Sequence, residues 1–277
     1  MNVRIAELNL YPVKGCRGIA LRSAKLAATG LEVDGIGDRE WVVVDGEGEF
    51  LSQREYPKMA LIETRLTPAS LLLKAPGMLL LEVPFDSEGD VVQVRVWDDK
   101  VSAVTQGEVA DHWLSNYLGV PARLMRFDYE GKRLAAHRYT GKDDAPFKFA
   151  DAFPLLVTST ASLADVNARL QRQGHAPVSV ARFRPNLVLD GLPAFEEDYV
   201  KLLRIGELAI RPVKPCARCS VPGVDPATGE QSPIVPDLLA AMRGTPDGVM
   251  FGVNAIVVEG AGGTLRVGGD VEVELRL

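Results

Sequence analysis

The chain has 277 residues, 47% of them hydrophobic and 25% charged, and its 31 Lys and Arg against 37 Asp and Glu give a formal net charge of −6. This composition is typical of a globular protein and excludes a disordered chain. The acidic balance excludes general binding of DNA or RNA, which needs a basic surface to displace counterions from phosphates. No stretch approaches the roughly 18 consecutive apolar residues of a membrane helix, and the first residues lack a signal-peptide pattern. We therefore expect a cytoplasmic protein that does not associate with a membrane.

The first third of the chain has the alternating pattern and the turn signals of short β-strands. Strands are expected over 3–13 and 41–45, and a hairpin over 91–104 that turns at Asp98-Asp99. Several short strands with regular turns favour a barrel or a sandwich. From Gly107 to Gly119 the apolar residues recur at helical spacing, which predicts a helix and, soon after it, a domain boundary.

The remainder of the chain mixes strands and helices. The polar stretch 133–150 is expected to be a long surface loop, a kind of segment that is often functional or mobile. A strand over 154–158 is expected to enter a helix at Ser159, which belongs to the residue types that cap helix N-termini. Further elements are expected as a strand over 186–190, a hairpin over 200–213 turning at Gly206-Glu207, a short helix over 238–243, and strands over 253–258 and 271–277.

These elements predict an α+β, β-rich fold in two domains. At about 150 residues per domain the length fits two domains, each with a sizeable core. We place an N-terminal β-barrel-like domain over residues 1–121. A second domain over 122–277 is expected to contain a mixed β-barrel with flanking helices.

Only three cysteines occur, Cys16, Cys216 and Cys219, too few and too odd a number for a disulfide framework. Cys216 and Cys219 lie in the segment 211–229, whose prolines exclude a helix, so we expect both on a constrained loop after a strand. The neighbouring Lys214 and Arg218 are of the type that favours a thiolate, which is the form that attacks electrophiles or binds metals.

Three interpretations of this pair remain open at the level of the residues. A structural zinc site takes four Cys or His ligands, which here would have to come from Cys16 and three scattered histidines, His112, His137 and His175. A thioredoxin-type dithiol requires the pair at the start of a helix, which the prolines contradict. The third interpretation is a pair of partly buried thiols with no chemical role.

Basic residues recur at strand ends and in loops, next to Gly, Pro or Asn, as Lys14, Arg39, Arg54 and Arg184. Each one alone is best explained as a surface charge or an ion pair. Together, in an acidic protein, they predict the capture of a phosphate-bearing cofactor, because guanidinium groups match phosphate oxygens. The turn at Ser159 would add N–H and hydroxyl donors. Thiols beside such a phosphate site favour a cofactor with an anionic part and a thiophilic metal or an electrophilic centre.

Five motifs occur in order along nearly the whole chain. They are Tyr11-Pro-Val-Lys-Gly15, Gly37-Asp-Arg-Glu-Trp41, Ser159-Thr-Ala-Ser-Leu-Ala-Asp165, Arg182-Phe-Arg-Pro-Asn186, and Cys216-Ala-Arg-Cys219 followed by Val224-Asp-Pro-Ala-Thr-Gly229. Together they resemble the MOSC family, named for the C-terminal domain of molybdenum cofactor sulfurase. The resemblance includes the family's N-terminal β-barrel domain. It is greatest to the mitochondrial amidoxime-reducing component and to bacterial reductases of N-hydroxylated nucleobases.

The resemblance implies a molybdopterin-type cofactor whose molybdenum is bound by a protein thiolate. By its position in the motif, Cys219 would be the metal ligand and the catalytic residue, whereas Cys16 is expected to be non-catalytic. Arg54 and Asp225 match the family less closely. The residues that the resemblance assigns to cofactor binding are Lys14, Arg39, Ser159, Thr160, Arg184, Asn186 and Arg218.

The implied activity is the reduction of N-hydroxylated small molecules such as hydroxylamines, amidoximes and N-hydroxylated nucleobases, with release of water. The stretch 133–150 is expected to contribute to substrate choice. Because an iron–sulfur cluster of the plant ferredoxin type needs four cysteines, none is expected in this chain, and electrons would come from a separate flavin or iron–sulfur protein. The membrane anchor of the mitochondrial relatives is also not expected. The alternative is a non-catalytic protein that carries the molybdenum cofactor, or sulfur on Cys219.

Overall fold

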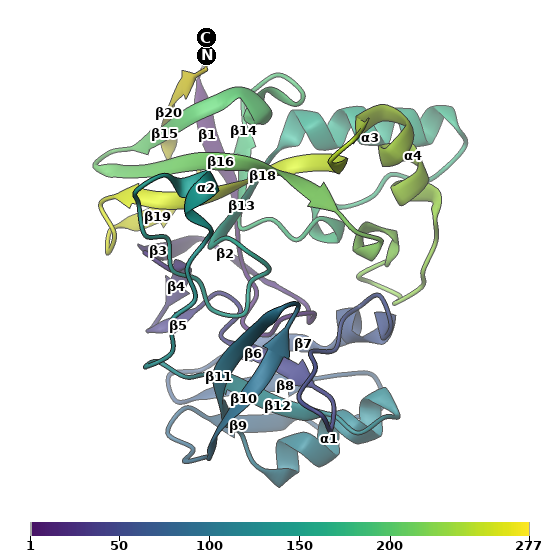
Figure 1. Cartoon of the computed structure of the whole chain (residues 1–277). Helices are drawn as coiled ribbons and strands as arrows, with labels where there is room; N and C mark the ends of the chain where they lie inside the picture. The colour runs from purple at the N-terminus through teal and green to yellow at the C-terminus, as the bar shows by residue number, and fades with distance from the viewer. Residues whose placement is uncertain (1, 277) are drawn as a thin grey trace.

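Seven strands close a mixed β-barrel in the computed structural model, which describes residues 2–276 (Figure 1). Among these barrel strands, β13 and β14 pair in parallel and the other neighbours pair antiparallel, and the pairing of β13 with β18 closes the ring. Buried aliphatic side chains such as Ile5, Leu189 and Ile210 form one core cluster between these strands. In order around the barrel the strands are β13 (Leu155–Ser159), β14 (Leu187–Asp190), β1 (Val3–Leu10), β20 (Asp270–Leu275), β15 (Val200–Ile205), β16 (Leu208–Arg218) and β18 (Gly248–Glu259).

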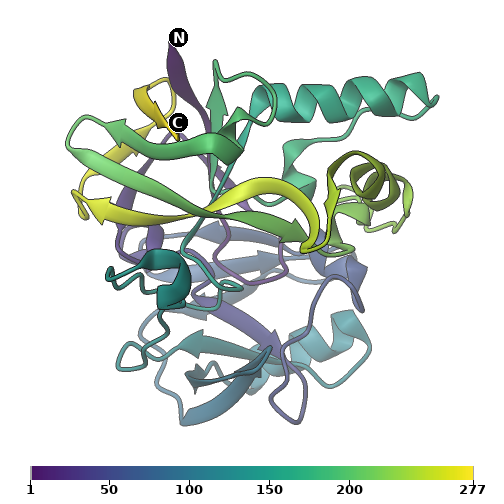
Figure 2. The same ribbon diagram turned by 45° about the horizontal axis from the view of Figure 1, so that its top comes forward.

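Two helices lie along one side of the barrel (Figure 2). Their apolar residues, spaced three or four apart as in Val166 and Leu170, form a stripe that packs around Phe183 and Phe251. The elements are α3 (Thr160–Arg172), α4 (Ile234–Arg243), the 3-10 turns η2 (Val180–Arg182), η3 (Glu196–Tyr199) and η4 (Val221–Gly223), and the short strands β2 (Ile19–Leu21) and β17 (Gly244–Thr245), which extend the barrel sheet.

The lower part of the molecule in Figure 1 is built from two small antiparallel sheets and one helix. One sheet has the order β10 (Val91–Val96), β11 (Asp99–Thr105), β12 (Arg123–Phe127) and β6 (Trp41–Val44). The other consists of β7 (Glu63–Leu66), β8 (Ser70–Lys74) and β9 (Leu81–Pro84), beside η1 (Pro57–Leu61) and α1 (Glu108–Leu118). Trp41, Met59 and Leu114 belong to the core that joins these elements.

The N-terminal segment crosses between the two parts. Its first strand, β1, pairs with β14 and β20 and so lies within the barrel. A further sheet joins β19 (Thr264–Arg266) to β3 (Ser23–Ala27), β4 (Gly30–Val33) and β5 (Ile36–Gly37). Hydrogen bonding within the sheets therefore links residues on both sides of residue 121. The domain boundary at residue 121 stays a prediction.

The predicted β-rich α+β class is confirmed, and most predicted elements are present. The hairpin β15–β16 turns at Gly206-Glu207 as expected, whereas the hairpin β10–β11 turns one residue early, at Trp97-Asp98. Gly119 ends α1 in the left-handed conformation. Among the described residues, no helix is long and apolar enough to cross a membrane.

The expectation of a long surface loop over 133–150 is wrong for much of this stretch. It contains a short helix, α2 (His137–Thr140), and the buried residues Phe147 and Phe149. Arg133 is buried as well, and its guanidinium donates to the carbonyl oxygens of Lys148 and Ala150 at 2.6 and 2.9 Å. Buried backbone carbonyl oxygens need hydrogen-bond donors. In this irregular segment Arg133 supplies them in place of the backbone N–H groups of a regular helix or sheet.

Candidate functional site

A cavity of about 280 Å³, here called the central cavity, lies where the barrel meets the lower part of the molecule. Its lining comes from segments that are far apart in sequence. Among the described residues it has six basic side chains and one acidic side chain. The charged and sulfur-bearing residues that line it are Lys14, Arg39, Arg54, Asp151, Arg184, Lys214, Cys216, Arg218 and Cys219.

The structure brings most of the predicted site residues together in this cavity and leaves two outside it. Those that line it are Lys14, Arg39, Arg184, Asn186, Arg218 and Cys219. Arg54, which matched the family less closely, lines it too, whereas Asp225 does not. Ser159 and Thr160 are not among the lining residues.

Arg39 and Arg184 form the most constrained part of the lining. Their guanidinium carbons lie 4.3 and 4.4 Å from the centroid of the Tyr11 ring. Both have positive φ angles, 48° and 56°, a conformation that non-glycine residues rarely adopt and that costs about 1–3 kcal/mol each. Strained backbone at two neighbouring cations is a feature of ligand-binding sites.

Two guanidinium groups in the cavity have nitrogen atoms that lack a partner within the described chain. Nη1 of Arg184 donates to the Cys16 carbonyl oxygen at 2.7 Å, but Nη2 is buried and unpaired. Arg218 donates to Cys216 Sγ at 3.2 Å and to the Phe183 carbonyl oxygen at 2.9 Å, while its buried Nε is unpaired. Burial, with the charge of Arg39 second, lowers the pKa of Arg184 to about 10. These groups suit an anion, because buried donors are costly when unpaired.

Asn186 orients Arg39 through a hydrogen bond. It is 1% exposed, and its side-chain oxygen accepts from the Leu156 backbone N–H at 3.1 Å and from Arg39 Nη1 at 3.3 Å. Its side-chain nitrogen donates to the Asn9 carbonyl oxygen at 3.2 Å. The residue thus ties β1 and β13 to Arg39.

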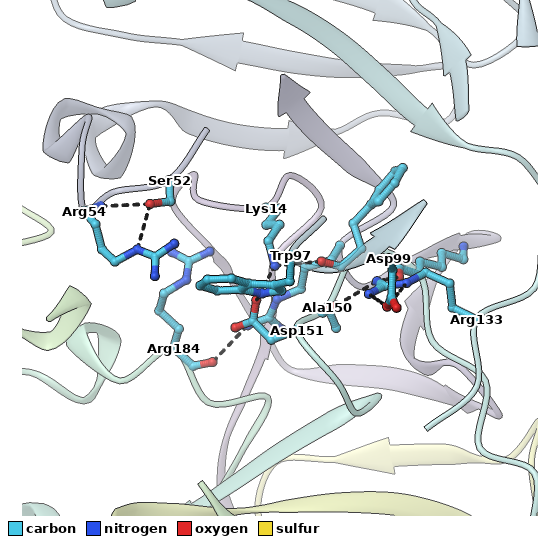
Figure 3. A network of polar contacts seen from close by, with 12 residues as sticks. Lys14, Ser52, Arg54, Trp97, Asp99, Arg133, Ala150, Asp151 and Arg184 are labelled. Atoms are coloured by element: carbon cyan, nitrogen blue, oxygen red, sulfur yellow. Dashed lines mark hydrogen bonds and ion pairs between the residues drawn. The ribbon is translucent and has the colours of Figure 1, made fainter. Parts of the chain in front are cut away.

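Lys14, Asp151 and Trp97 form a polar cluster in the cavity (Figure 3). Lys14 Nζ donates to the Phe149 carbonyl oxygen at 2.9 Å and pairs with Asp151 Oδ1, which also accepts from Trp97 Nε1 at 2.9 Å. Burial lowers the pKa of Lys14. Burial also acts to raise the pKa of Asp151, but the ion pair with Lys14 and the two hydrogen bonds outweigh it and hold that pKa well below its usual range. Asp151 is therefore a carboxylate at neutral pH.

The two cavity cysteines lie at the end of a strand, so the expectation of a loop is wrong for Cys216. Strand β16 continues through Pro212 and Pro215 to Arg218. Its second half pairs with β18 through register shifts at both prolines, which is where a strand tolerates proline. Cys219 is the first residue after the strand and is exposed.

The positions of Cys216 and Cys219 bear on whether the two thiols form a disulfide or hold a structural zinc. Two strand residues separate Cys216 from Cys219, so at about 3.3 Å per residue their Cα atoms are roughly 10 Å apart, beyond the ~7 Å reach of a disulfide. Both are free thiols. Within residues 2–276, no three His, Cys, Asp or Glu side chains are grouped to hold a metal ion. A structural zinc site takes four such ligands.

A carboxylate of the protein occupies the helix start at which Ser159 and Thr160 were expected to bind an anion. Glu197 is 1% exposed, and its oxygens accept from Ser159 N at 3.3 Å, Ser159 Oγ at 3.0 Å and Ser162 Oγ at 2.8 Å. Burial raises the pKa of Glu197. The Thr160 hydroxyl donates to Asp190 at 2.8 Å. The donors at this helix start are therefore used inside the protein.

Sequence reasoning missed two residues of the cavity, Asp151 and Trp97. Asp151 follows the stretch that was expected to be a surface loop, and Trp97 lies in a hairpin turn far along the chain from the other site residues. Their sequence signals are weak, because one carboxylate or one indole in a turn is an ordinary surface feature. A fold was needed to place them beside Lys14.

Comparison with known protein families gives two matches along the chain. Residues 2–121 match the MOSC N-terminal beta barrel domain, and residues 144–272 match the MOSC domain. The chain is 33% identical over 230 residues to mitochondrial amidoxime reducing component 2 of Bos taurus, covering 81% of this chain and 67% of that protein. It is 32% identical over 235 residues to mitochondrial amidoxime-reducing component 1 of Homo sapiens, covering 82% and 68%.

Among solved structures, the YUAD protein from Bacillus subtilis aligns with a TM-score of 0.48 and 10% identity, over 100% of this chain and 98% of that chain. The two matched domains together span most of the sequence, and the chain spans about two thirds of the length of the mitochondrial relatives. This chain belongs to the MOSC family and joins a MOSC N-terminal beta barrel domain to a MOSC domain.

Proposed function

We propose that this protein is a molybdenum-cofactor-dependent oxidoreductase that reduces N-hydroxylated compounds and releases water. One observation supports this most: the exposed thiol of Cys219 shares a cavity with six basic side chains, and two of these bear buried nitrogen atoms without partners in the described chain. An anionic cofactor with a thiophilic metal matches such a set of groups. The amidoxime-reducing relatives support the same conclusion.

The residues that would hold the cofactor divide by chemistry. Arg39, Arg184 and Arg218 would bind its phosphate and pterin oxygens, with Asn186 orienting Arg39 through the 3.3 Å hydrogen bond. Lys14 would contribute a further positive charge. Cys219 would bind the metal as a thiolate. Ser159 and Thr160 are left out of this set, because their donors are engaged by Glu197 and Asp190.

The balanced overall reaction converts an N–OH group, two electrons and two protons into an N–H group and water. The bound cofactor would supply the two-electron redox chemistry, and the protein would supply binding, orientation and electrostatics. Asp151 keeps the Lys14 ammonium in place and remains a carboxylate itself. Phe153 and Phe183 form apolar parts of the same lining.

Electron supply, location and substrate range belong to the proposal as well. We propose a separate flavin or iron–sulfur protein as electron donor, a cytoplasmic location, and small N-hydroxylated molecules as substrates, in keeping with the word amidoxime in the names of the relatives. No iron–sulfur cluster, nucleic acid or membrane is part of this proposal.

Turnover tests the proposal directly. Cofactor-loaded protein from a cofactor-competent host is supplied with a chemically reduced dye and benzamidoxime, and formation of benzamidine is measured. We expect turnover by the wild type and by Ser220→Ala, the exposed neighbour of the ligand, and none by Cys219→Ser. Wild-type protein that carries the cofactor but does not reduce any N-hydroxylated compound would instead support the carrier function.

A further inference from the structure

Trp97 occupies a backbone position at which glycine is the usual residue. It is the first of the two residues that join β10 to β11, between the paired residues Val96 and Asp99. Its φ angle is 58°, whereas Asp98 is not among the residues with positive φ. In two-residue hairpin turns with this pattern the first position is normally glycine. A tryptophan at this position is strained in its backbone, so we ask which contacts its side chain makes.

Several contacts hold the indole in the central cavity (Figure 3). Its Nε1 donates to Asp151, and the Phe50 ring lies 4.9 Å away at an interplanar angle of 60°. The guanidinium carbon of Arg54 lies 4.3 Å from the ring centroid, and Arg54 Nε donates to the Ser52 hydroxyl at 3.1 Å.

A second contact fixes the hairpin turn from outside the cavity. Buried Arg133, which also binds the carbonyl oxygens at 148 and 150, donates to the Asp99 carboxylate at 2.6 Å. One arginine thus joins the turn that carries Trp97 to the segment that carries Asp151. The indole is therefore held in place by contacts within the chain.

Trp97 is also the tryptophan that remains accessible. It is 43% exposed, whereas Trp41 and Trp113 are 0% and 8% exposed. A half-exposed indole in a cavity, with its only donor already used, offers its π-face and not a hydrogen bond. The Arg54 guanidinium, which lies over the indole ring, adds a flat cation that stacks on planar groups.

We propose that Trp97 and Arg54 form a platform that selects planar aromatic substrates for the central cavity. This inference rests on the proposed reductase function and names the part of the cavity that sets its substrate preference. Cys219 and Arg184 come from the barrel, whereas the platform comes from the hairpin β10–β11 and the segment after β6. Substrate and cofactor would thus be recognised by different parts of the molecule. A planar aryl or heteroaryl N-hydroxy compound would stack on the platform.

Because position 97 has a backbone conformation that favours glycine, the main test variant is Trp97→Gly. Trp97→Gly removes the ring and relieves the backbone strain, so the protein is expected to fold, whereas Trp97→Phe keeps a ring and loses only the hydrogen bond to Asp151. The substrates are benzamidoxime and its aliphatic counterpart acetamidoxime, reduced by cofactor-loaded protein. We expect Trp97→Gly to lower the ratio of kcat/KM for benzamidoxime over acetamidoxime by about three- to tenfold, which is the size of one aromatic stacking contact. The loss should lie in KM for benzamidoxime, and Trp97→Phe should retain most of the ratio.

An unchanged ratio in Trp97→Gly would overturn the platform while leaving the reductase function in place. A binding measurement covers the case in which the wild type does not turn over at all. Acrylamide quenches exposed tryptophan, and we expect benzamidoxime, but not acetamidoxime, to protect part of the wild-type fluorescence from quenching. Trp97→Phe should lack the quenchable fraction, which assigns the signal. Absence of protection in the wild type would overturn the platform even if the enzyme is active.

Discussion

Arg39 donates a hydrogen bond from Nη2 to the backbone carbonyl oxygen of Arg184 at 3.2 Å, so two residues of the same charge are held together against the ring of Tyr11. Burial of the Tyr11 hydroxyl raises its pKa to about 12, although the charges of Arg184 and Arg39 act to lower it, so the phenol stays neutral. Asp38 pairs with Arg39, and burial followed by the charge of Arg39 lowers the pKa of Arg184. The folded protein therefore accepts electrostatic repulsion at the place where we propose that an anion binds.

The first prediction follows from this repulsion. Arg184→Gln should lower the cofactor content of the purified protein at least several-fold, because it removes the cation with the unpaired Nη2. The free energy of unfolding of the cofactor-free protein should change by about 1 kcal/mol or less, since the lost hydrogen bond to Cys16 and the relieved repulsion act in opposite directions. Pterin content and denaturant unfolding measure the two quantities.

The matched control for this variant is Arg172→Gln, at an exposed position on α3. It should change neither cofactor content nor stability. Full cofactor retention by Arg184→Gln would remove Arg184 from the proposed binding set.

A second prediction concerns Glu40, which is 0% exposed and pairs with Lys148 and Arg126. It also accepts from the Gly37 backbone N–H at 2.7 Å, next to Arg39. Glu40→Gln leaves two cations without a buried partner and should destabilise the protein by about 3–5 kcal/mol. Glu274→Gln, which breaks the exposed pair with Lys201, should cost no more than about 1 kcal/mol.

The effect of Glu40 should also depend on pH. Burial acts to raise the pKa of Glu40, but its interactions with Lys148 and Tyr129 outweigh burial and lower that pKa in the folded protein. A lowered carboxyl pKa stabilises the fold above the unfolded value of about 4.5 and loses that contribution as the pH falls through the folded value. The stability difference between wild type and Glu40→Gln should therefore shrink in acid. A difference that is constant from pH 7 to pH 3 would contradict the ion-pair explanation.

A third prediction concerns Glu197, whose effect on stability should change with pH in the opposite direction to that of Glu40. Burial raises the pKa of Glu197, so the folded state binds more protons than the unfolded state between about pH 4.5 and the raised value. Glu197 consequently stabilises the fold less as the pH rises through that window. Glu197→Gln keeps an acceptor for Ser159 and Ser162 and removes the charge. Denaturant unfolding at several pH values should show this variant gaining stability relative to the wild type from pH 4 to pH 8, and a relative loss would refute the assignment.

Sequence patterns were sufficient for features that depend on neighbouring residues. The helix start at Ser159 and the turn at Gly206-Glu207 follow from local capping and turn chemistry. Local chemistry was not sufficient for the occupant of that helix start, because Glu197 reaches it from a separate 3-10 turn. The expectation of an exposed loop over 133–150 was wrong for a similar reason. Arg133 donates hydrogen bonds to the carbonyl oxygens of Lys148 and Ala150, so this part of the segment can be buried.

The motif residues Lys14, Arg39, Arg184 and Cys219 lie in different segments, and the family resemblance was the signal that linked them before the fold did. Asp151 and Trp97 had no such signal. The contacts of Asp151 with Lys14 and with Trp97 depend on how the hairpin β10–β11 meets the barrel, which is a tertiary relationship that periodicity does not encode.

The measurement that tests the central claim most directly is the molybdenum and oxidised-pterin content of protein purified from a cofactor-competent host. The account predicts metal and pterin in near-equal amounts in the wild type, and loss of molybdenum from Cys219→Ser. Cys216→Ser, which alters the other cavity thiol, should retain molybdenum. Folded wild-type protein with neither molybdenum nor pterin, or with zinc at about one equivalent in their place, would contradict it.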